Sequence, residues 1–540
     1  MRNPQRSTTS LRLVVVAAVL AAIFSGLSAI RVLAAKAAGA DDDPQPMPVP
    51  ASLDSHGIPP AARGEIALIE AEIRQTEQQT LRLVGTNMDP MHQIQTLGKL
   101  ELFDPSLSVN KQEACSFCHM PEVGYTGRSS VLNMTTVAYP GSVRTRFSDR
   151  KPMSYTYATL APVLHYNATQ KDFYGGNFWD MRATGWRLQS PSAEQAQGPP
   201  TNPVEMGLPD SACVAYRLAT GRYESLFQQI WGTAITQISW PANAERVCTT
   251  PAGAGGVGPQ LSLSSEDRDR ANTIYDQFAL SIAAYEASPE VDAFSSKFDA
   301  YLANQATLTP QEAHGYELFN GSGKCNTCHL SGLGNGTNGG AATDVAPLFT
   351  DFTSANLGVP KNTAIPYLYE SKPDRYGFVA NPLGQAYVDE GVGAFLSGPS
   401  VPDKSWASLA PDFIGHMQVA SLRNVDQRPY PGFVKSYMHN GYMKSLKEVV
   451  HFYNTRDTQC RTPDDPGAGK TCWPAPEVSA NEDQTIGDLG LSSSDEDDIV
   501  AFMKTLTDGY MQVSPMSSKL NKAIQIEAAS LRRESLRQQR

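Results

Sequence analysis

The sequence lacks the biased composition of fibrous, disordered and nucleic-acid-binding chains. Hydrophobic residues make up 41% and charged residues 18% of its 540 residues, which is ordinary for a globular protein. Positive charge is not in excess: the formal net charge is −11, which argues against nucleic acid as a partner. A chain of this length can form two or three domains with substantial cores.

Long apolar runs are also missing, except near the N-terminus. There, residues 13–30 are apolar, three arginines precede them, and small residues follow. This pattern is typical of a secretory signal peptide, which we predict over residues 1–40. The run is about as long as the shortest membrane spans, so an uncleaved anchor stays open, and contact with a membrane is expected only in that case. Removing residues 1–35, which hold four arginines and no lysine or acidic residue, changes the formal charge from −11 to about −15.

Cysteine is scarce, and its spacing is informative. Four of the eight cysteines form two Cys-x-x-Cys-His motifs, with Cys115, Cys118 and His119 in the first and Cys325, Cys328 and His329 in the second. In a c-type haem site each thiol adds to a porphyrin vinyl group, and the adjoining imidazole is the proximal iron ligand. A redox or zinc Cys-x-x-Cys with a chance histidine is the alternative for one motif. Two complete copies on an exported chain predict two covalently bound haem c groups and, because haem is attached outside the bacterial inner membrane, a periplasmic location.

The other four cysteines are an even number in an oxidising compartment, which indicates disulfides. Proximity in the sequence favours Cys213 with Cys248 and Cys460 with Cys472. The other pairings stay open at this point.

The organisation of the chain follows from the two motifs. Each comes after a short amphipathic stretch that contains Leu-Phe, at residues 102–103 and 318–319, which is a weak internal repeat. We therefore expect a mainly α protein of two cytochrome-c-like haem domains with long loops and few short strands. The predicted segments are a Pro-rich linker (41–60), an N-terminal helical extension (61–94), the first haem domain (95–304), the second haem domain (305–507) and a polar C-terminal helix or tail (508–540).

Further segments between and after the motifs are typical of one family. Residues 179–183 read Trp-Asp-Met-Arg-Ala, residues 194–199 read Glu-Gln-Ala-Gln-Gly-Pro, residues 202–206 read Asn-Pro-Val-Glu-Met and residues 437–441 read Tyr-Met-His-Asn-Gly. With two haem motifs in the same order, the chain resembles the bacterial dihaem cytochrome c peroxidases and their relative MauG. The resemblance covers roughly residues 95–507.

The resemblance implies roles for individual side chains. Cleavage of peroxide at a haem needs an open iron site, an acid–base group and a supply of electrons. Glu205 corresponds to the family's catalytic glutamate, Gln195 to the glutamine of the haem cavity and Trp179 to the tryptophan that assists electron transfer between the haems. Alone, these would pass for a surface glutamate, a solvated helix residue and a core tryptophan. Arg182 and Arg423 are candidate partners of the haem propionates, although structural ion pairs are equally ordinary for them.

The sixth ligand of the second haem is predicted to be Tyr453. It lies fourteen residues after His439, where peroxidases of the family carry methionine and MauG carries tyrosine. Met438, Met443 and His451 are the competing candidates. An anionic oxygen ligand would lower the reduction potential of this haem relative to a thioether.

The chain also departs from the family. Residues 120–150 contain no histidine, although members with a blocked first haem use one there; Met134 and Tyr139 are the only substitutes. We therefore expect an accessible first haem. The resemblance also implies a Ca²⁺ ion between the haems, but residues 152–157 lack the asparagine that binds it, which leaves backbone carbonyls as the possible ligands.

From these features we expect a dihaem c-type cytochrome peroxidase. It would reduce hydrogen peroxide to water with electrons from a small periplasmic redox protein, either a cytochrome c or a cupredoxin. One alternative is a MauG-like enzyme that oxidises a protein through a high-valent iron state. A second is a non-catalytic electron-transfer cytochrome, against which Glu205 and Gln195 argue, because a carrier needs no distal acid. The identity of the donor and the formation of a homodimer stay open.

Overall fold

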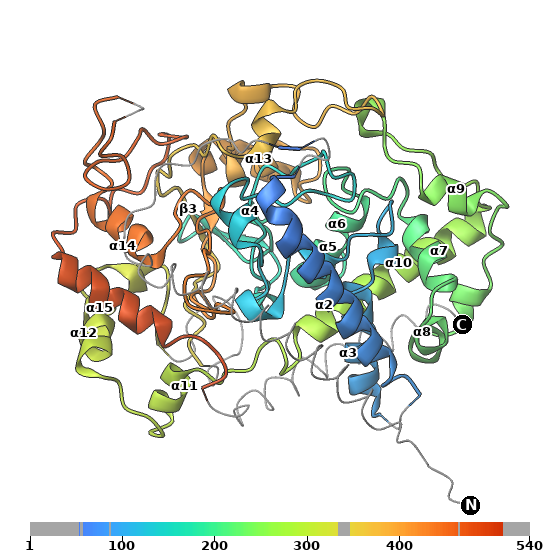
Figure 1. The fold of residues 1–540 in the computed structure, drawn as a ribbon, viewed down its shortest axis with the longest axis horizontal. Coiled ribbons are helices and arrows are strands. Elements are labelled where there is room, and N and C mark those ends of the chain that lie inside the picture. Colours follow the sequence, from blue (N-terminus) through green and yellow to red (C-terminus); the bar gives the residue numbers. More distant parts are fainter. Residues whose placement is uncertain (1–52, 55–57, 86–87, 333–345, 463–464, 511–540) are drawn as a thin grey trace, which may run out of the picture.

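The computed structural model describes residues 53–54, 58–85, 88–332, 346–462 and 465–510 (Figure 1). The predicted signal peptide, most of the predicted linker and nearly all of the predicted C-terminal tail lie outside the described residues. The described part is mainly helical with a few short strands, which confirms the predicted fold class. None of its helices combines the length and the apolar composition that crossing a bilayer requires.

All but one of the six longer helices begin at a side chain that caps them, and the exception follows Ala62, which has no capping side chain. The six helices are α2 (Arg63–Leu81), α3 (Pro90–Leu102), α10 (Ser265–Glu286), α12 (Pro310–Asn320), α14 (Leu446–Thr455) and α15 (Ser493–Lys504). Asp89 accepts hydrogen bonds from the first backbone N–H groups of α3, and Thr309 forms a capping box with Glu312 at the start of α12. Such caps satisfy donors that have no partner within the helix.

The remaining elements are short. The other helices are α4 (Ser130–Met134), α5 (Pro191–Ala196), α6 (Gly198–Thr201), α7 (Ala212–Ala219), α8 (Glu224–Trp231), α9 (Ala244–Cys248), α11 (Lys297–Leu302) and α13 (Gly391–Ser397). Two antiparallel strand pairs are formed by β1 (His165–Asn167) with β2 (Asp172–Tyr174) and by β3 (Ser354–Ala355) with β4 (Met417–Gln418). His165 lies opposite Tyr174 in the first pair, and Ser354 lies opposite Gln418 in the second.

The weak sequence repeat corresponds to a repeated helix pair. Helix α3 packs on α10, and α12 packs on α15. The helices approach at a glycine in both pairs: a Cβ atom at Gly98 would lie 1.9 Å from the carbonyl oxygen of Ser281, and one at Gly315 would lie 1.8 Å from that of Asp498. Each haem motif follows the first helix of its pair. In Figure 1 the pair of α12 and α15 lies at the left, and the pair of α3 and α10 lies right of centre.

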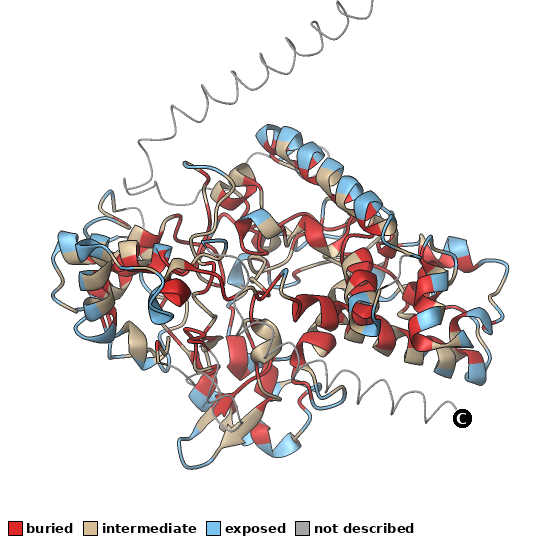
Figure 2. Ribbon diagram, turned by 90° about the horizontal axis from the view of Figure 1, so that it is seen from below, coloured by how far each residue is buried: buried red, intermediate tan, exposed pale blue. Residues whose placement is uncertain are grey.

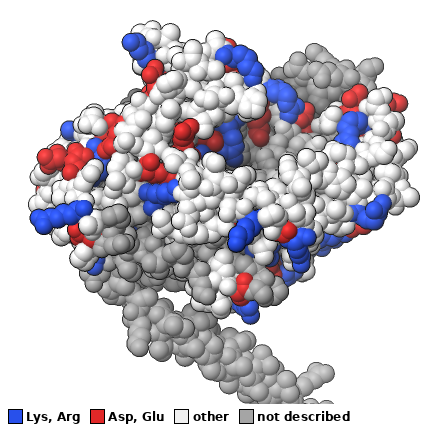
Figure 3. Space-filling view, turned by 90° about the horizontal axis from the view of Figure 1, so that it is seen from above, with Lys and Arg blue, Asp and Glu red and all other residues white. Residues whose placement is uncertain are grey.

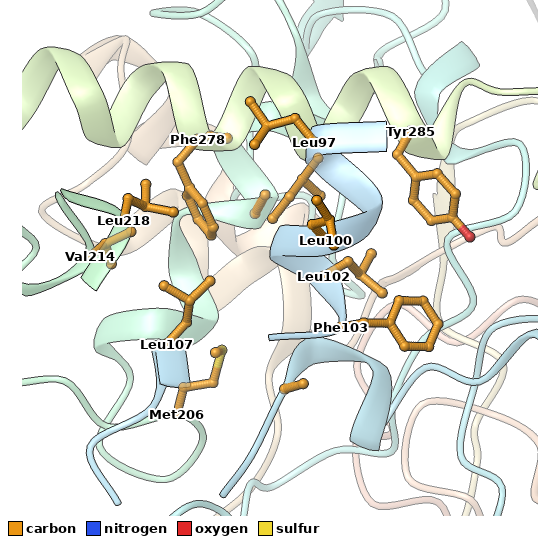
Figure 4. Close-up of a cluster of buried hydrophobic side chains, with 14 of the residues drawn as sticks. Leu97, Leu100, Leu102, Phe103, Leu107, Met206, Val214, Leu218, Phe278 and Tyr285 are labelled. Atoms are coloured by element: carbon orange, nitrogen blue, oxygen red, sulfur yellow. The ribbon is translucent and has the colours of Figure 1, made fainter. Parts of the chain in front are cut away.

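Buried side chains form two main cores. The first core contains residues between 62 and 291, together with Phe433, and the second core contains residues between 298 and 506. Figure 4 shows part of the first core, where Leu97 and Leu100 of α3 lie near Phe278 of α10. Helix α2 buries one face, including Ile66, against this core and exposes the opposite face. Figure 2 shows the same division into a buried and an exposed face on the outer helices in general. The domain limits themselves stay a prediction, and the predicted limit after residue 94 falls inside α3.

Candidate haem sites and the junction between them

The first haem motif opens onto a cavity. Its cysteines belong to or follow a short 3-10 helix, Cys115–Phe117, and Cys115, Cys118 and His119 all line the cavity. His119 Nδ1 lies 3.1 Å from the carbonyl oxygen of Tyr125, so it donates there and leaves Nε2 for an iron ion. Burial lowers the pKa of His119 to about 4, and the imidazole is therefore neutral, as a metal ligand must be.

The second motif repeats this arrangement. Cys325, Cys328 and His329 line a second cavity, and a 3-10 helix, Cys325–Thr327, carries the first cysteine. His329 Nδ1 lies 2.9 Å from the carbonyl oxygen of Phe349 and donates a hydrogen bond to it. As in the first motif, Nε2 is left available for an iron ion. Burial lowers the pKa of His329 as well.

The thiols of both motifs are available for attachment of haem. The disulfides Cys213–Cys248 and Cys460–Cys472 are formed, which confirms the favoured pairing. The other four cysteines, those of the two motifs, are free. Each cavity therefore offers two free thiols and a neutral imidazole, and this donor set fits a covalently attached haem.

Two predicted polar side chains line the first cavity with the motif. Helix α5 carries Gln195, and the turn that follows α6 carries Glu205. Burial raises the pKa of Glu205 to about 6, although the nearby charge of Arg182 acts in the opposite direction. A carboxyl group with this pKa exchanges protons readily near neutral pH.

Trp179 lines both cavities, as do Lys151, Met153 and Ser154. The indole Nε1 donates a hydrogen bond of 3.2 Å to the carbonyl oxygen of Lys151, and the ammonium group of Lys151 lies 5.9 Å from the ring centroid. The imidazole of His439 contacts the indole edge-on, with 6.5 Å between the ring centroids. The tryptophan is thus held in one orientation between the two motifs. Lys151 was not predicted, because a lysine beside a proline gives no sequence signal of its position.

The two predicted propionate partners have carboxylate partners within the chain. Arg182 lines the first cavity and forms a 2.7 Å salt bridge with Asp180. Arg423 lines the second cavity, but both of its terminal nitrogens bind Asp299, at 3.0 and 2.8 Å. These are the structural ion pairs that the sequence left open, and a contact with haem propionates stays a prediction for both residues.

Tyr453 lies on α14 and lines the second cavity with His329. Among the described residues no hydrogen-bond partner of its hydroxyl group is found, and burial raises its pKa. Of the competing candidates for the sixth ligand, Met438 lines the same cavity.

Met443 and His451 do not present a free ligand atom to the second cavity. Met443 is buried in the second core and does not line the cavity. Both ring nitrogens of His451 are used, since Nδ1 lies 2.9 Å from Glu496 and Nε2 lies 2.9 Å from the carbonyl oxygen of Lys470. Tyr453 and Met438 therefore remain as candidates.

The loop after the first motif contains Met134 and Tyr139, the two residues that could take the place of the missing histidine ligand, and it brings one of them to the first cavity. Tyr139 lines the first cavity, while Met134, at the end of α4, does not. The hydroxyl oxygen of Tyr139 already accepts a hydrogen bond from the backbone N–H of Ser129, at 2.5 Å. Glu113 and Glu286, which the sequence did not single out, also line this cavity.

The comparisons with known proteins agree with this architecture. The family model of the di-haem cytochrome c peroxidases matches residues 92–307. The methylamine utilization protein MauG of Paracoccus denitrificans is 30% identical over 418 residues, which cover 76% of this chain and 88% of that protein. The cytochrome-c peroxidase IdrP1 of Denitromonas iodatirespirans is 24% identical over 417 residues, which cover 76% of this chain and 80% of that protein.

A solved structure shares the fold. The diheme peroxidase BthA from Burkholderia thailandensis superposes with a TM-score of 0.57 at 24% identity, over 80% of this chain and 92% of that one. The chain therefore belongs to the family of the di-haem cytochrome c peroxidases and MauG, and it is an oxidoreductase with two haem groups.

Proposed function

We propose that the protein reduces hydrogen peroxide to water at its first haem site, with two electrons that arrive through the second. One observation carries this proposal: Glu205 and Gln195 line the cavity of the first motif, and Trp179 lines that cavity and the second one. An acid–base group at one haem and an aromatic side chain between both are what a peroxidase requires and what a simple electron carrier does not.

Glu205 would move the proton that peroxide cleavage requires. The haem supplies an open iron position and accepts single electrons. The carboxylate would take the proton from one oxygen of the peroxide and give it to the other, which would leave as water. Two protons from solvent and two electrons from the donor would balance the reaction, which yields the second water. Gln195 would orient the peroxide by hydrogen bonding.

The haems would be covalently attached. Cys115 and Cys118 would bind the first haem and Cys325 and Cys328 the second, with the neighbouring histidines as proximal ligands. Tyr453 would be the sixth ligand of the second iron.

The remaining proposals concern location and partners. Export would place the protein in the periplasm, where a small cytochrome c or cupredoxin would be the electron donor. The charge of about −15 after removal of the signal peptide suits a basic donor. On the face seen in Figure 3, acidic and basic side chains of the described residues are interspersed.

Oxidation of a protein substrate, as in MauG, is the second candidate. The observation that favours it is the position of Tyr453 in the second cavity beside His329. An anionic oxygen ligand stabilises oxidised iron, so the second site would retain oxidising equivalents instead of passing electrons from a donor.

Steady-state peroxide consumption with a reduced small c-type cytochrome tests the proposal. We expect peroxide-dependent oxidation of the cytochrome, and a loss of roughly 10²–10⁴-fold in Glu205→Gln with nearly unchanged haem spectra. Glu317→Gln, at an exposed position on α12, is the matched control and should keep wild-type turnover. Wild-type turnover in Glu205→Gln would remove Glu205 from the mechanism. Reaction with peroxide without oxidation of the cytochrome would favour the second candidate.

A further inference from the structure

A buried ammonium group lies close to the place where the two cores meet. Lys435 is only 4% exposed, and its Nζ donates to the carbonyl oxygens of Val123, Asn424 and Gln427 at 2.9, 3.0 and 3.3 Å. Burial lowers the pKa of this lysine. However, a neutral amine has two N–H donors and an ammonium group has three, so three carbonyl acceptors match the charged form.

The three carbonyl groups come from both sides of the junction. Val123 belongs to the first core. Asn424 is tied to the second core, because its backbone N–H donates to the carbonyl oxygen of Leu506. The two segments touch beside the ammonium group, where a Cβ atom at Gly124 would lie 2.9 Å from the Asn424 carbonyl oxygen. The ammonium group of Lys435 therefore binds backbone carbonyl groups on both sides of the junction.

A second lysine repeats this arrangement nearby. Lys444 is also 4% exposed, and its Nζ donates to the carbonyl oxygens of Asn133 and Gly441, both at 2.7 Å. Asn133 lies on α4, and its side-chain amide donates to the carbonyl oxygen of Val434 at 2.9 Å. The amino groups of two buried lysines thus connect the segment that follows the first haem motif with residues 434–441.

The residues at this junction do not fit a calcium ion. Ca²⁺ requires six to eight oxygen ligands, commonly including carboxylates. Two oxygens of the segment 152–157 are engaged: the carbonyl of Pro152 accepts from Thr126 Oγ1, and Ser154 Oγ donates to the carbonyl of Gly124, both at 2.6 Å. The carbonyl groups of Val123, Asn424 and Gln427 bind Lys435. A divalent cation there would be repelled by the ammonium groups of Lys435 and Lys151.

We propose that the ammonium group of Lys435 is the fixed cation at the junction of the two haem sites and holds them in register without a divalent metal ion. Lys435 and Trp179 line the same cavity, so a shift of the Lys435 segment would change the surroundings of the residue that connects both sites. Lys435 is in this sense a positioning residue. The inference goes beyond the proposed function, since it holds whichever substrate receives the oxidising equivalents.

The wild-type holoprotein gives the first test. After dialysis against EGTA we expect well below one calcium ion per chain by elemental analysis, with unchanged haem absorption spectra and an unchanged thermal midpoint. Addition of CaCl₂ should change none of these. A calcium ion that remains at one per chain, or altered haem spectra after its removal, would overturn the proposal. Peroxide is not involved, so failure here is distinct from failure of the proposed function.

The second test replaces the ammonium group. Lys435→Met keeps the length of the side chain and leaves the buried carbonyls of Val123 and Gln427 without a donor, while that of Asn424 keeps only the backbone N–H of Gln427, so the thermal midpoint should fall by roughly 5 °C. Electron exchange between the haems after rapid reduction of one of them should also slow. Lys372→Met, at an exposed lysine, should change neither. A Lys435→Met protein with wild-type stability and exchange rate would refute the role, and if this variant does not fold, the calcium measurement on the wild type still decides.

Discussion

The protonation of Glu205 links the cavity directly to the chemistry. Burial raises the pKa of its carboxyl group to about 6, and the proposed step starts from the carboxylate. The fraction of active protein should therefore increase as the pH rises toward 6 and level off above it. We expect the second-order rate constant for peroxide to rise about tenfold per pH unit below pH 6. Stopped-flow measurements between pH 4.5 and 8, with Glu205→Gln as the variant that lacks this dependence, check it; a flat wild-type profile would contradict the assignment.

Tyr453 offers a spectroscopic prediction. Tyr453→Phe removes the oxygen that faces the second cavity and keeps the ring, so the absorption and electron paramagnetic resonance spectra of the second haem should change while those of the first stay the same. Met438→Leu is the matched test of the competing candidate and should leave both spectra unaltered. A thioether charge-transfer band in the wild type that disappears in Met438→Leu would assign the position to methionine.

At the scale of single residues, the haem motifs could be predicted from the sequence, whereas the partners of two buried side chains could not. The two Cys-x-x-Cys-His motifs could be singled out as candidate haem sites because thioether attachment demands a fixed local spacing. The partner of Arg423 could not, because Asp299 lies far away in the chain and only the folded structure brings the two together. The same holds for Lys435, whose acceptors are backbone carbonyls and carry no residue-type signal.

At the scale of elements, the two helix pairs depend on glycines where the helices cross. Gly98→Ala would place a Cβ atom 1.9 Å from the Ser281 carbonyl oxygen, so α3 and α10 would have to move apart. We expect a loss of about 1–3 kcal/mol in the free energy of unfolding. Denaturant unfolding measured by circular dichroism tests this prediction.

Helix α2 provides the control for that substitution. Gly64 is also helical, but it is exposed and has nothing within 4 Å of its ideal Cβ position. Gly64→Ala should therefore leave the protein as stable or slightly more stable, because alanine has the higher helix propensity. Equal effects at both positions would mean that the close approach of α3 and α10 does not limit stability.

The elements were predictable to different degrees. Helices with a regular apolar pattern, such as α2, could be read from the sequence, and so could the short helices before the two motifs. The sequence could indicate that a short helix precedes each motif, but it could not show that α3 meets α10, because the partner lies more than 160 residues later and no local pattern marks it.

At the scale of the whole molecule, the two haem cavities share a wall. Trp179, Lys151, Met153 and Ser154 contribute to both linings. The resemblance to a known family predicted a bridging role for Trp179, whereas composition alone favoured an ordinary core residue. The shared wall results from the topology of the chain, since residues 120–155 and 420–445 are brought together although they lie far apart in the sequence.

This shared wall makes Trp179 the residue through which the two sites should communicate. Trp179→Phe keeps an aromatic ring but shortens the side chain and removes the hydrogen bond to the Lys151 carbonyl oxygen. We expect electron exchange between the haems to slow by about tenfold or more, equivalent to at least ~1.4 kcal/mol on the barrier. Proton transfer at the first site should be unaffected, because Glu205 keeps its surroundings. Trp186→Phe, which changes a tryptophan that is 42% exposed and lines neither of the two cavities, is the matched control. Pulse reduction followed by absorption at each haem separates the two steps: equal rates in both variants would mean that electrons pass between the sites by a route that does not include Trp179.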